Sequence, residues 1–256
     1  MKFLTCTYTD VGTRKKTNQD SMLVMQAKSD AGPVLMASVC DGMGGLAKGE
    51  VASAAMVRAL EDWFCTCLPS LLSDGFAFDK LQANWEELVK STSRRIADYG
   101  AKLHVELGTT AVVLLIIGNA YYILNVGDSR IYLLSDTICQ LTKDQTYVQR
   151  EIDLGNMTPE QAATDSKKNV LLQCIGASSV IQPEFVSGSL ATNQVYLICS
   201  DGFRHVVRPH EIYNEMNSKA LRGQKDMEAA AKKLTELNMA RGESDNISVI
   251  LVRTKE

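Results

Sequence analysis

Histidine is scarce in this 256-residue sequence, and the cysteines show no metal-binding or disulfide spacing. There are three histidines, so a histidine-based catalytic or metal centre has few residues to draw on. The seven cysteines are odd in number and include no CxxC pair. We therefore expect reduced thiols that act as small apolar residues in a reducing compartment, and no zinc site.

Long hydrophobic runs and a large charge of one sign are also missing. The N-terminal segment MKFLTCTYTDVG has no apolar core of signal-peptide length. The longest aliphatic run, residues 111–117, is too short to span a bilayer. A formal net charge of −3 argues against nucleic-acid binding. We therefore expect a cytoplasmic protein that binds neither a membrane nor a nucleic acid.

Strand and helix patterns alternate irregularly along the chain. Turn residues and β-branched runs predict strands over 22–26, 34–40, 109–117, 120–126, 130–135, 170–175, 185–189, 195–199 and 247–253. Helical periodicity predicts helices over 50–67, 78–103, 144–154, 209–217 and 225–239. Pro69 is expected to end the first helix, and a capping box at Thr158 to begin another. Because regular crossover helices are missing, we expect an α+β fold.

Aspartates stand at the ends of several predicted strands. Asp20 and Asp245 precede strands, Asp41 and Asp201 follow strands, and Asp128 lies in a turn between two of them. A single aspartate of this kind is usually a turn residue, but strand ends in a layered fold can converge on one edge. Converging carboxylates repel each other and need a cation. All-oxygen ligation suits Mg²⁺ or Mn²⁺.

Three glycines follow Asp41 in the segment DGMGG. Gly42, Gly44 and Gly45 carry no side chains, so a backbone carbonyl can approach an ion and a substrate can approach the strand end. Mg²⁺ keeps several waters and takes few carboxylates, so this many aspartates suits two ions that share a ligand. Such a pair lowers the pKa of a bound water and orients it for in-line attack on phosphorus. The pattern predicts a phosphate-ester hydrolase.

Eight segments in order resemble those of the metal-dependent Ser/Thr protein phosphatases of type 2C, in their compact bacterial form. They are TNQDS, VCDGMGG with GEVAS, LGTTAVV, VGDSRIY, LTKDQT, KNVLLQCIG, ICSDG and SDNISVILV. The resemblance implies a single domain over residues 1–256, built as a four-layer α/β/β/α sandwich of two packed antiparallel sheets flanked by helix pairs. It also implies a mobile flap over about residues 144–170.

The same resemblance implies a site for two Mn²⁺ or Mg²⁺ ions. Asp41 would bridge the ions, and the carbonyl of Gly42 would bind one of them. Asp201 and Asp245 would complete one ion's ligands. Asp41, Asp201 and Asp245 would thus be the catalytic residues, and Asp20 would support the site largely through water.

Other residues have lesser roles in the resemblance. Asp128 would bind a weaker third ion together with Asp201. Gln19 and Asn246 would lie behind the metal ligands. His205 stands where many members have an aspartate that helps to hold the third ion. We expect His205 to be a plain helix residue that leaves the third site poor; a softer metal ligand and a general acid are the alternatives.

The phosphate-binding position also departs from the family's pattern. Lys15 stands where the family usually has an arginine, and Arg14 precedes it. Either residue could bind phosphate, or both could belong to a solvated basic turn. Met43 stands where eukaryotic members carry a histidine proposed as general acid, so a leaving alkoxide would take its proton from elsewhere.

Two functions of different classes follow. The first is a monomeric phosphatase that hydrolyses phosphoserine and phosphothreonine in protein substrates of a Ser/Thr kinase. The alternative is a catalytically weak phosphopeptide-binding regulatory module of the same fold, which Lys15, Gln19 and His205 would favour. The intact set of mutually repelling core aspartates favours the enzyme. An enzyme acting on the phosphoserine of an anti-sigma antagonist is a variant of the first function.

Overall fold

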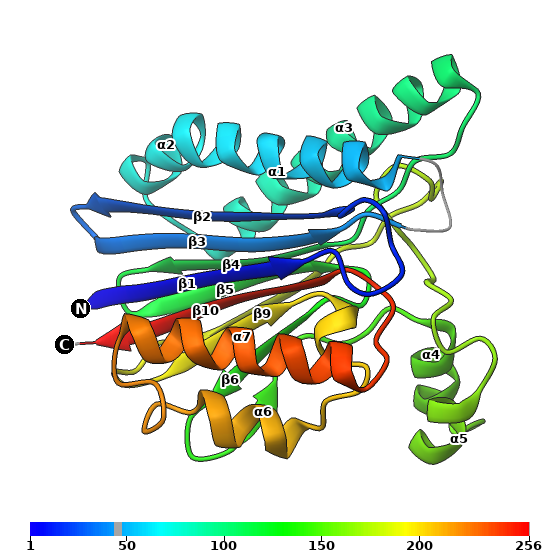
Figure 1. Ribbon diagram of the computed structural model, residues 1–256. Helices are drawn as coiled ribbons and strands as arrows, with labels where there is room; N and C mark the ends of the chain where they lie inside the picture. Colours follow the sequence, from blue (N-terminus) through cyan, green and yellow to red (C-terminus); the bar gives the residue numbers. More distant parts are fainter. Residues whose placement is uncertain (44–47, 256) are drawn as a thin grey trace.

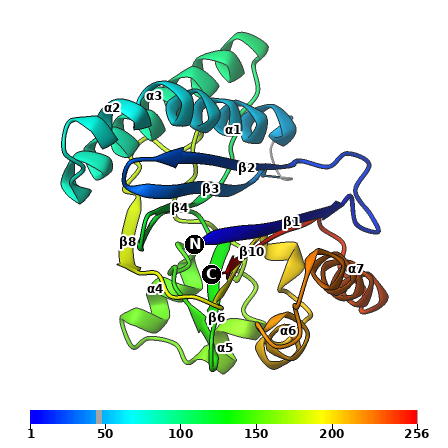
Figure 2. The same ribbon diagram turned by 90° about the vertical axis from the view of Figure 1, so that its left-hand side faces the viewer.

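The computed structural model, described over residues 1–43 and 48–255, contains two five-stranded antiparallel sheets packed face to face. Helices cover the outer face of each sheet (Figure 1). Figure 2 shows the two helical layers on opposite sides of the sheets. This arrangement confirms the predicted α+β four-layer sandwich.

Sheet A has the strand order β1-β10-β9-β6-β7. Its strands are β1 (Lys2–Asp10), β6 (Arg130–Leu134), β7 (Ile138–Gln140), β9 (Val195–Cys199) and β10 (Ile247–Lys255). The strands β1 and β10 pair along their whole length, with Lys2 opposite Lys255 and Asp10 opposite Ile247. The two chain ends therefore lie at one end of the sandwich, and the 10–20 and 240–247 segments lie at the other (Figure 1).

Sheet B has the strand order β2-β3-β4-β5-β8. Its strands are β2 (Asp20–Ser29), β3 (Gly32–Asp41), β4 (Ala111–Ile117), β5 (Ala120–Val126) and β8 (Glu184–Ser189). The β2–β3 hairpin closes where Ser29 pairs with Gly32. At its open end the register places Asp20 directly opposite Asp41.

The strand β3 shows why the sheets bury both faces. Residues 34–40 are all buried. Side chains alternate along a strand, so Met36 and Cys40 pack toward the helices on sheet B, whereas Leu35 and Val39 pack between the two sheets. A strand buried on both faces needs a continuous apolar run, which the sequence provides here.

The helices supply the outer layers. The helices α1 (Gly49–Thr66), α2 (Leu68–Ser73) and α3 (Phe78–Leu103) cover sheet B, and α6 (Pro209–Met216) and α7 (Gln224–Ala240) cover sheet A. Trp63 of α1 and Trp85 of α3 pack with ring centroids 5.7 Å apart. Trp85 also stacks at 6.4 Å on Phe185 of β8. Aromatic contacts thus fix both helices on the sheet.

The predicted flap region contains two short helices, α4 (Tyr147–Asp153) and α5 (Pro159–Thr164). Both lie outside the sandwich (Figure 1). The capping box predicted at Thr158 is confirmed, because its hydroxyl accepts from the Gln161 N–H while the Gln161 side chain accepts from the Thr158 N–H. The helix predicted from residue 144 begins later, after the cap at Thr146.

Two of the predicted elements were wrong, and two strands were missed. Pro69 does not follow the first helix as a stop but lies in the first turn of α2, where its missing N–H is tolerated. Residues 170–175 form isolated bridges, at Leu171 and Ile175, and not a strand. The strands β1 and β7 were not predicted, because β1 depends on a partner at the far end of the chain and β7 has three residues. No helix in the described part of the chain is long and apolar enough to cross a membrane.

Candidate metal centre

The backbone of Asp41 is held firmly at the end of β3. Its carbonyl accepts hydrogen bonds from the Thr110 N–H at 2.9 Å and the Thr109 hydroxyl at 3.0 Å. Its own N–H donates to the Thr110 hydroxyl at 3.0 Å, and that hydroxyl lies 2.9 Å from the hydroxyl of Ser129. The LGTTAVV and VGDSR segments thus fix the strand end. These hydroxyl residues were not predicted to belong to the site, although both segments are among the motifs of the sequence.

The structure brings the five predicted aspartates together at the end of the sandwich opposite the chain termini. Burial, and then the charges of Asp20, Asp201, Asp128 and Asp245, raise the pKa of Asp41 well above its ordinary value. Burial likewise raises the pKa of Asp20 to about 6 and that of Asp128 to about 7. The site is therefore a region of concentrated negative charge that disfavours the ionised carboxylates.

Two carboxylate oxygens in this region are buried without a hydrogen-bond partner among the described residues, Oδ1 of Asp20 and Oδ1 of Asp201. The other oxygen of each has one. The Ser200 hydroxyl donates to Asp20 Oδ2 at 2.9 Å, and the ring of His205 lies 3.2 Å from Asp201 Oδ2. An unpaired buried carboxylate oxygen is costly. A hard cation would satisfy both, so the donor set fits Mg²⁺ or Mn²⁺.

Two glycines of the site have no room for a side chain. A Cβ at Gly42 would collide with the carbonyls of Gly49 and Gln19, and one at Gly202 would collide with the carbonyl of Asn246. Glycine is needed at position 42 because neighbouring backbone approaches closely, which is a different reason from the ion and substrate approach that the sequence predicts. Gly44 and Gly45, which the sequence also linked to the site, lie outside the described residues.

Asn246 and Gln19 connect the segments that carry Asp20 and Asp245. The Gln19 N–H donates to Asn246 Oδ1 at 2.9 Å, and Asn246 Nδ2 donates to the carbonyl of Val11 at 2.9 Å. The Gln19 side chain donates to Glu50 Oε2 at 3.3 Å, which reaches the first turn of α1. These contacts give both residues a positioning role.

Lys15 and Arg14 differ in their surroundings. The Lys15 ammonium lies 3.0 Å from Asp245 Oδ1, and its side chain is 29% exposed. Arg14 is an exposed residue. Of the two residues that the sequence left open, Lys15 is the one beside the aspartates.

His205 is not the plain helix residue that the sequence predicts. It follows the short 3-10 helix η1 (Asp201–Phe203), and its ring lies between two carboxylates. Its Nε2 is 3.2 Å from Asp201 Oδ2, and its Nδ1 is 3.2 Å from Glu243 Oε2. Burial would lower the pKa of His205, but the hydrogen bonds to both carboxylates raise it to about 10. Burial would raise the pKa of Asp201, but the hydrogen bond and charge of His205 bring it below its usual range.

Asp128 is paired with an arginine that the sequence analysis did not select. Nη2 of Arg204 donates to the Asp128 carbonyl at 3.0 Å and lies 3.3 Å from Asp128 Oδ2 and 3.4 Å from Asp144 Oδ2. Arg130 binds Asp144 through two hydrogen bonds of 2.7 Å. The one available signal was a cation directly after the SDGF segment, in a turn next to the aspartates.

As the side chains lie, no three Asp, Glu, His or Cys side chains within residues 1–43 and 48–255 are arranged to hold one ion together. Protein cations account for this at two of the predicted ligands, because Lys15 contacts Asp245 and His205 contacts Asp201. The donors fit a hard cation in type, but Asp245 must exchange the Lys15 ammonium for the ion.

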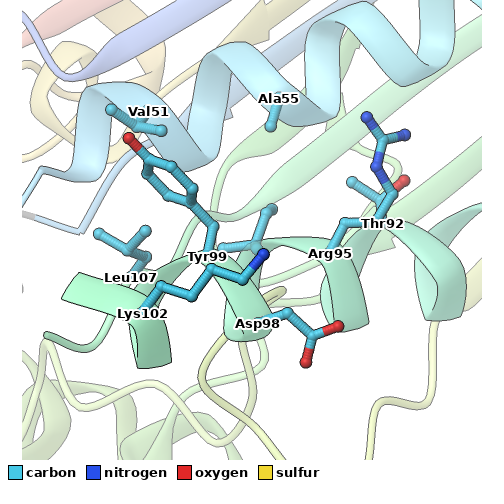
Figure 3. Close-up of a pocket in the computed structure, with 9 residues that line it drawn as sticks. Val51, Ala55, Thr92, Arg95, Asp98, Tyr99, Lys102 and Leu107 are labelled. Carbon is cyan, nitrogen blue, oxygen red and sulfur yellow. The ribbon is translucent and has the colours of Figure 1, made fainter. Parts of the chain in front are cut away.

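A separate pocket of about 410 Å³ lies between α1 and α3 (Figure 3). Val51 and Ala55 of α1, Tyr99 of α3 and Leu107 are among its lining residues, and Tyr99 extends toward Val51. None of the five aspartates lines this pocket. The candidate chemistry is therefore outside it.

Comparison with known proteins identifies the class. A model of the family described as Protein phosphatase 2C matches residues 12–242, and the chain belongs to this family. It is 32% identical to the serine/threonine phosphatase stp of Listeria innocua, over 95% of this chain and 93% of that protein. It is 31% identical to the serine/threonine protein phosphatase PstP of Mycobacterium tuberculosis, over 94% of this chain but only 43% of PstP. The chain thus spans less than half of the length of PstP.

Solved structures agree with this assignment. A serine/threonine phosphatase of S. agalactiae has a TM-score of 0.84 at 28% identity, covering 99% of this chain and 100% of that chain. The PstP catalytic domain in complex with two manganese ions has a TM-score of 0.75 at 30% identity, covering 99% of each chain. The fold and the type of bound ion in that relative match the sandwich and the donor set described above.

Proposed function

We propose that this protein is a Mg²⁺- or Mn²⁺-dependent phosphatase that removes phosphate from phosphoserine and phosphothreonine in proteins. The observation that carries this proposal is the convergence of acidic side chains around Asp41, with buried unpaired oxygens on Asp20 and Asp201. The relatives named as serine/threonine phosphatases, and the one solved with manganese, support the same activity.

In the proposed site, Asp41 would bridge two ions and the Gly42 carbonyl would bind one of them. Asp201 and Asp245 would complete the protein ligands, and Asp20 would support them. When bound, such ions lower the pKa of a coordinated water and orient it for in-line attack on phosphorus. The chain's contribution is geometric: the Thr109 and Thr110 contacts hold the Asp41 backbone at the strand end.

Lys15 would bind the substrate phosphate. Its ammonium already lies among the aspartates, 3.0 Å from Asp245 Oδ1, whereas Arg14 is exposed. An ammonium is a point charge without the two-pronged donor geometry of arginine. Lys15 would therefore attract phosphate without fixing its orientation as strictly as an arginine would.

The proposed substrates are phosphoproteins made by a Ser/Thr kinase, and the proposed state is a monomer in the cytoplasm. The seven cysteines are all free thiols, four of them buried. This use of cysteine fits a reducing compartment.

The test is hydrolysis of a phosphothreonine peptide by the wild type and by Asp41→Asn, titrated separately with Mn²⁺ and Mg²⁺. We expect metal-dependent release of phosphate that falls at least about 100-fold in the variant, because the substitution removes a ligand charge with little change of shape. Asp136→Asn, at an exposed turn between β6 and β7, is the matched control and should retain full activity. Peptide binding without turnover in either metal would instead favour the regulatory module.

A further inference from the structure

We propose that Arg204 supplies, from the chain itself, the positive charge that a third metal ion would bring to Asp128, and that the ring of His205 occupies the oxygen of Asp201 that such an ion would share. The protein would then work with two ions and bind no third one. This inference rests on the proposed function, because it concerns the same acidic site. It replaces the sequence-based expectation of a weaker third ion near these two aspartates.

Arg204 already occupies the carboxylate of Asp128. Its Nη2 donates to the carbonyl at 3.0 Å and lies 3.3 Å from Oδ2 of the same residue. The two side chains are only 13% and 9% exposed. Arginine stays charged at every physiological pH, and a charge pair shielded from water interacts more strongly than an exposed one. The Asp128 carboxylate therefore has a charged partner within the chain.

The position of Arg204 is itself fixed from a second side. Asp144 Oδ2 lies 3.4 Å from Nη2 of Arg204, and both oxygens of Asp144 accept hydrogen bonds from Arg130. Arg130 also donates to the hydroxyl of Tyr132. Two arginines and two aspartates thus form one connected group next to the site. A divalent ion placed against Asp128 would face the repulsion of Arg204 at hydrogen-bond distance.

His205 occupies one oxygen of Asp201 in a similar way. Its ring bridges Asp201 Oδ2 and Glu243 Oε2, with 3.2 Å at each end. The other oxygen of Glu243 accepts the N–H groups of Ser244 at 2.7 Å and Asp245 at 2.8 Å, so the glutamate cannot turn away from the ring without losing them. His205 is therefore held between Asp201 and Glu243 through both ring nitrogens and is not an open metal ligand.

The two carboxylate oxygens of Asp201 have different surroundings. Oδ2 is bound by His205, whereas Oδ1 is buried and has no partner in the described part of the chain. Oδ1 can therefore bind an ion of the two-ion site beside Asp41. Oδ2 cannot bind an ion shared with Asp128, because His205 already contacts it. The geometry thus distinguishes the site at Asp41, which has unpaired carboxylate oxygens for ions, from the site at Asp128, where side chains of the protein pair with the carboxylates. Arg204 and His205 act as positioning residues in this scheme.

The experiment is a count of Mn²⁺ ions per chain by calorimetry, repeated by electron paramagnetic resonance of free Mn²⁺, up to millimolar metal. We expect two ions for the wild type and the same two for Asp128→Asn, because Asp128 binds Arg204. Three ions in the wild type that become two in Asp128→Asn would overturn the inference. A wild type that binds no Mn²⁺ would overturn the proposed function, and the inference with it.

A second variant tests the exclusion directly. Arg204→Ala combined with His205→Asp removes the Arg204 cation and the His205 ring and adds a carboxylate, so the count should rise from two to three. Arg204→Lys keeps the charge and should leave the count at two. A folded double variant that still binds two ions would contradict the role given to these residues. If the double variant does not fold, the Asp128→Asn comparison decides the question alone.

Discussion

At the scale of single residues, Gly12 shows how a missing side chain shapes the metal centre. Its φ is +76°, and a Cβ there would collide with the carbonyl of Asp245. Gly75 has nearly the same conformation, with φ +78°, but a Cβ at that position would meet nothing within 4 Å. The two glycines share a left-handed backbone conformation but differ in what an added side chain would meet.

We therefore predict different outcomes for Gly12→Ala and Gly75→Ala. Both should lose about 1 kcal/mol of stability from the left-handed conformation. Only Gly12→Ala should also weaken Mn²⁺ binding, by about tenfold or more, because it moves the segment that carries Asp245. Thermal unfolding and metal titration of both variants provide the measurement, and equal metal affinities would contradict the prediction.

Lys15 is expected to have opposite effects on metal and substrate. In the metal-free protein its ammonium holds Asp245 Oδ1 at 3.0 Å, so Lys15→Ala should tighten Mn²⁺ binding. The same variant should raise KM for a phosphopeptide by about tenfold, the equivalent of about 1.4 kcal/mol of phosphate binding. Arg14→Ala is the matched control and should change neither quantity by more than about twofold. If Lys15→Ala and Arg14→Ala change KM equally, the prediction that Lys15 alone contacts the phosphate is wrong.

At the scale of secondary-structure elements, Trp85 is the largest of several buried side chains that pack α3 against sheet B. Trp85 is fully buried between Trp63 and Phe185. Trp85→Ala should cost about 3–5 kcal/mol of unfolding free energy, because a large cavity would remain under the helix. Tyr99→Ala on the same helix, where the side chain is 45% exposed, should cost less than about 1 kcal/mol. Urea denaturation of both variants measures the difference.

Elements with a strong local pattern were predictable from the sequence, whereas those that need distant partners were not. The bounds predicted for α3 agree with the structure, because its helical periodicity is sustained over 26 residues. The strand β1 was not predicted, because its side-chain pattern indicates a strand only once it is paired with β10. The segment at 170–175 has strand-like residues, but its partners are single loop positions.

The candidate site divides along the same line. The aspartates could be selected because each stands at the end of an apolar run, and the motif order made the set specific. The partners Glu243 and Arg204 could not be selected, because their contacts join loops that are far apart in the sequence. The sequence alone could not decide whether His205 is a metal ligand, a plain helix residue or a general acid. Its position between two carboxylates depends on the tertiary structure.

At the scale of the whole molecule, the metal-free protein should lose stability as the pH rises. The pKa values of Asp20 and Asp128 are raised to about 6 and about 7, chiefly by burial. Groups with a raised pKa in the folded state contribute stability that is present below about pH 4 and is lost as the pH rises through about 6 to 7. We therefore expect the Tm of chelator-treated protein to fall between about pH 4 and about pH 7.

Added Mn²⁺ should reverse this loss at about pH 8. An ion at 100 times its dissociation constant adds about 2.7 kcal/mol to the unfolding free energy. Scanning calorimetry with chelator and with excess Mn²⁺ checks both parts of the prediction, and Asp41→Asn should show a much smaller metal effect. A Tm that depends on neither pH nor metal would show that ionisation of these buried aspartates does not destabilise the folded protein.

The place of β10 in sheet A has a consequence for synthesis. It follows every other strand in sequence order, yet it lies between β1 and β9. While residues 247–255 are still inside the ribosome, β1 has no partner in its sheet and the segment carrying Asp245 has no strand to anchor it. A nascent chain can therefore fold much of sheet B early, but sheet A and the segment that carries Asp245 take their places only after residues 247–255 have left the ribosome.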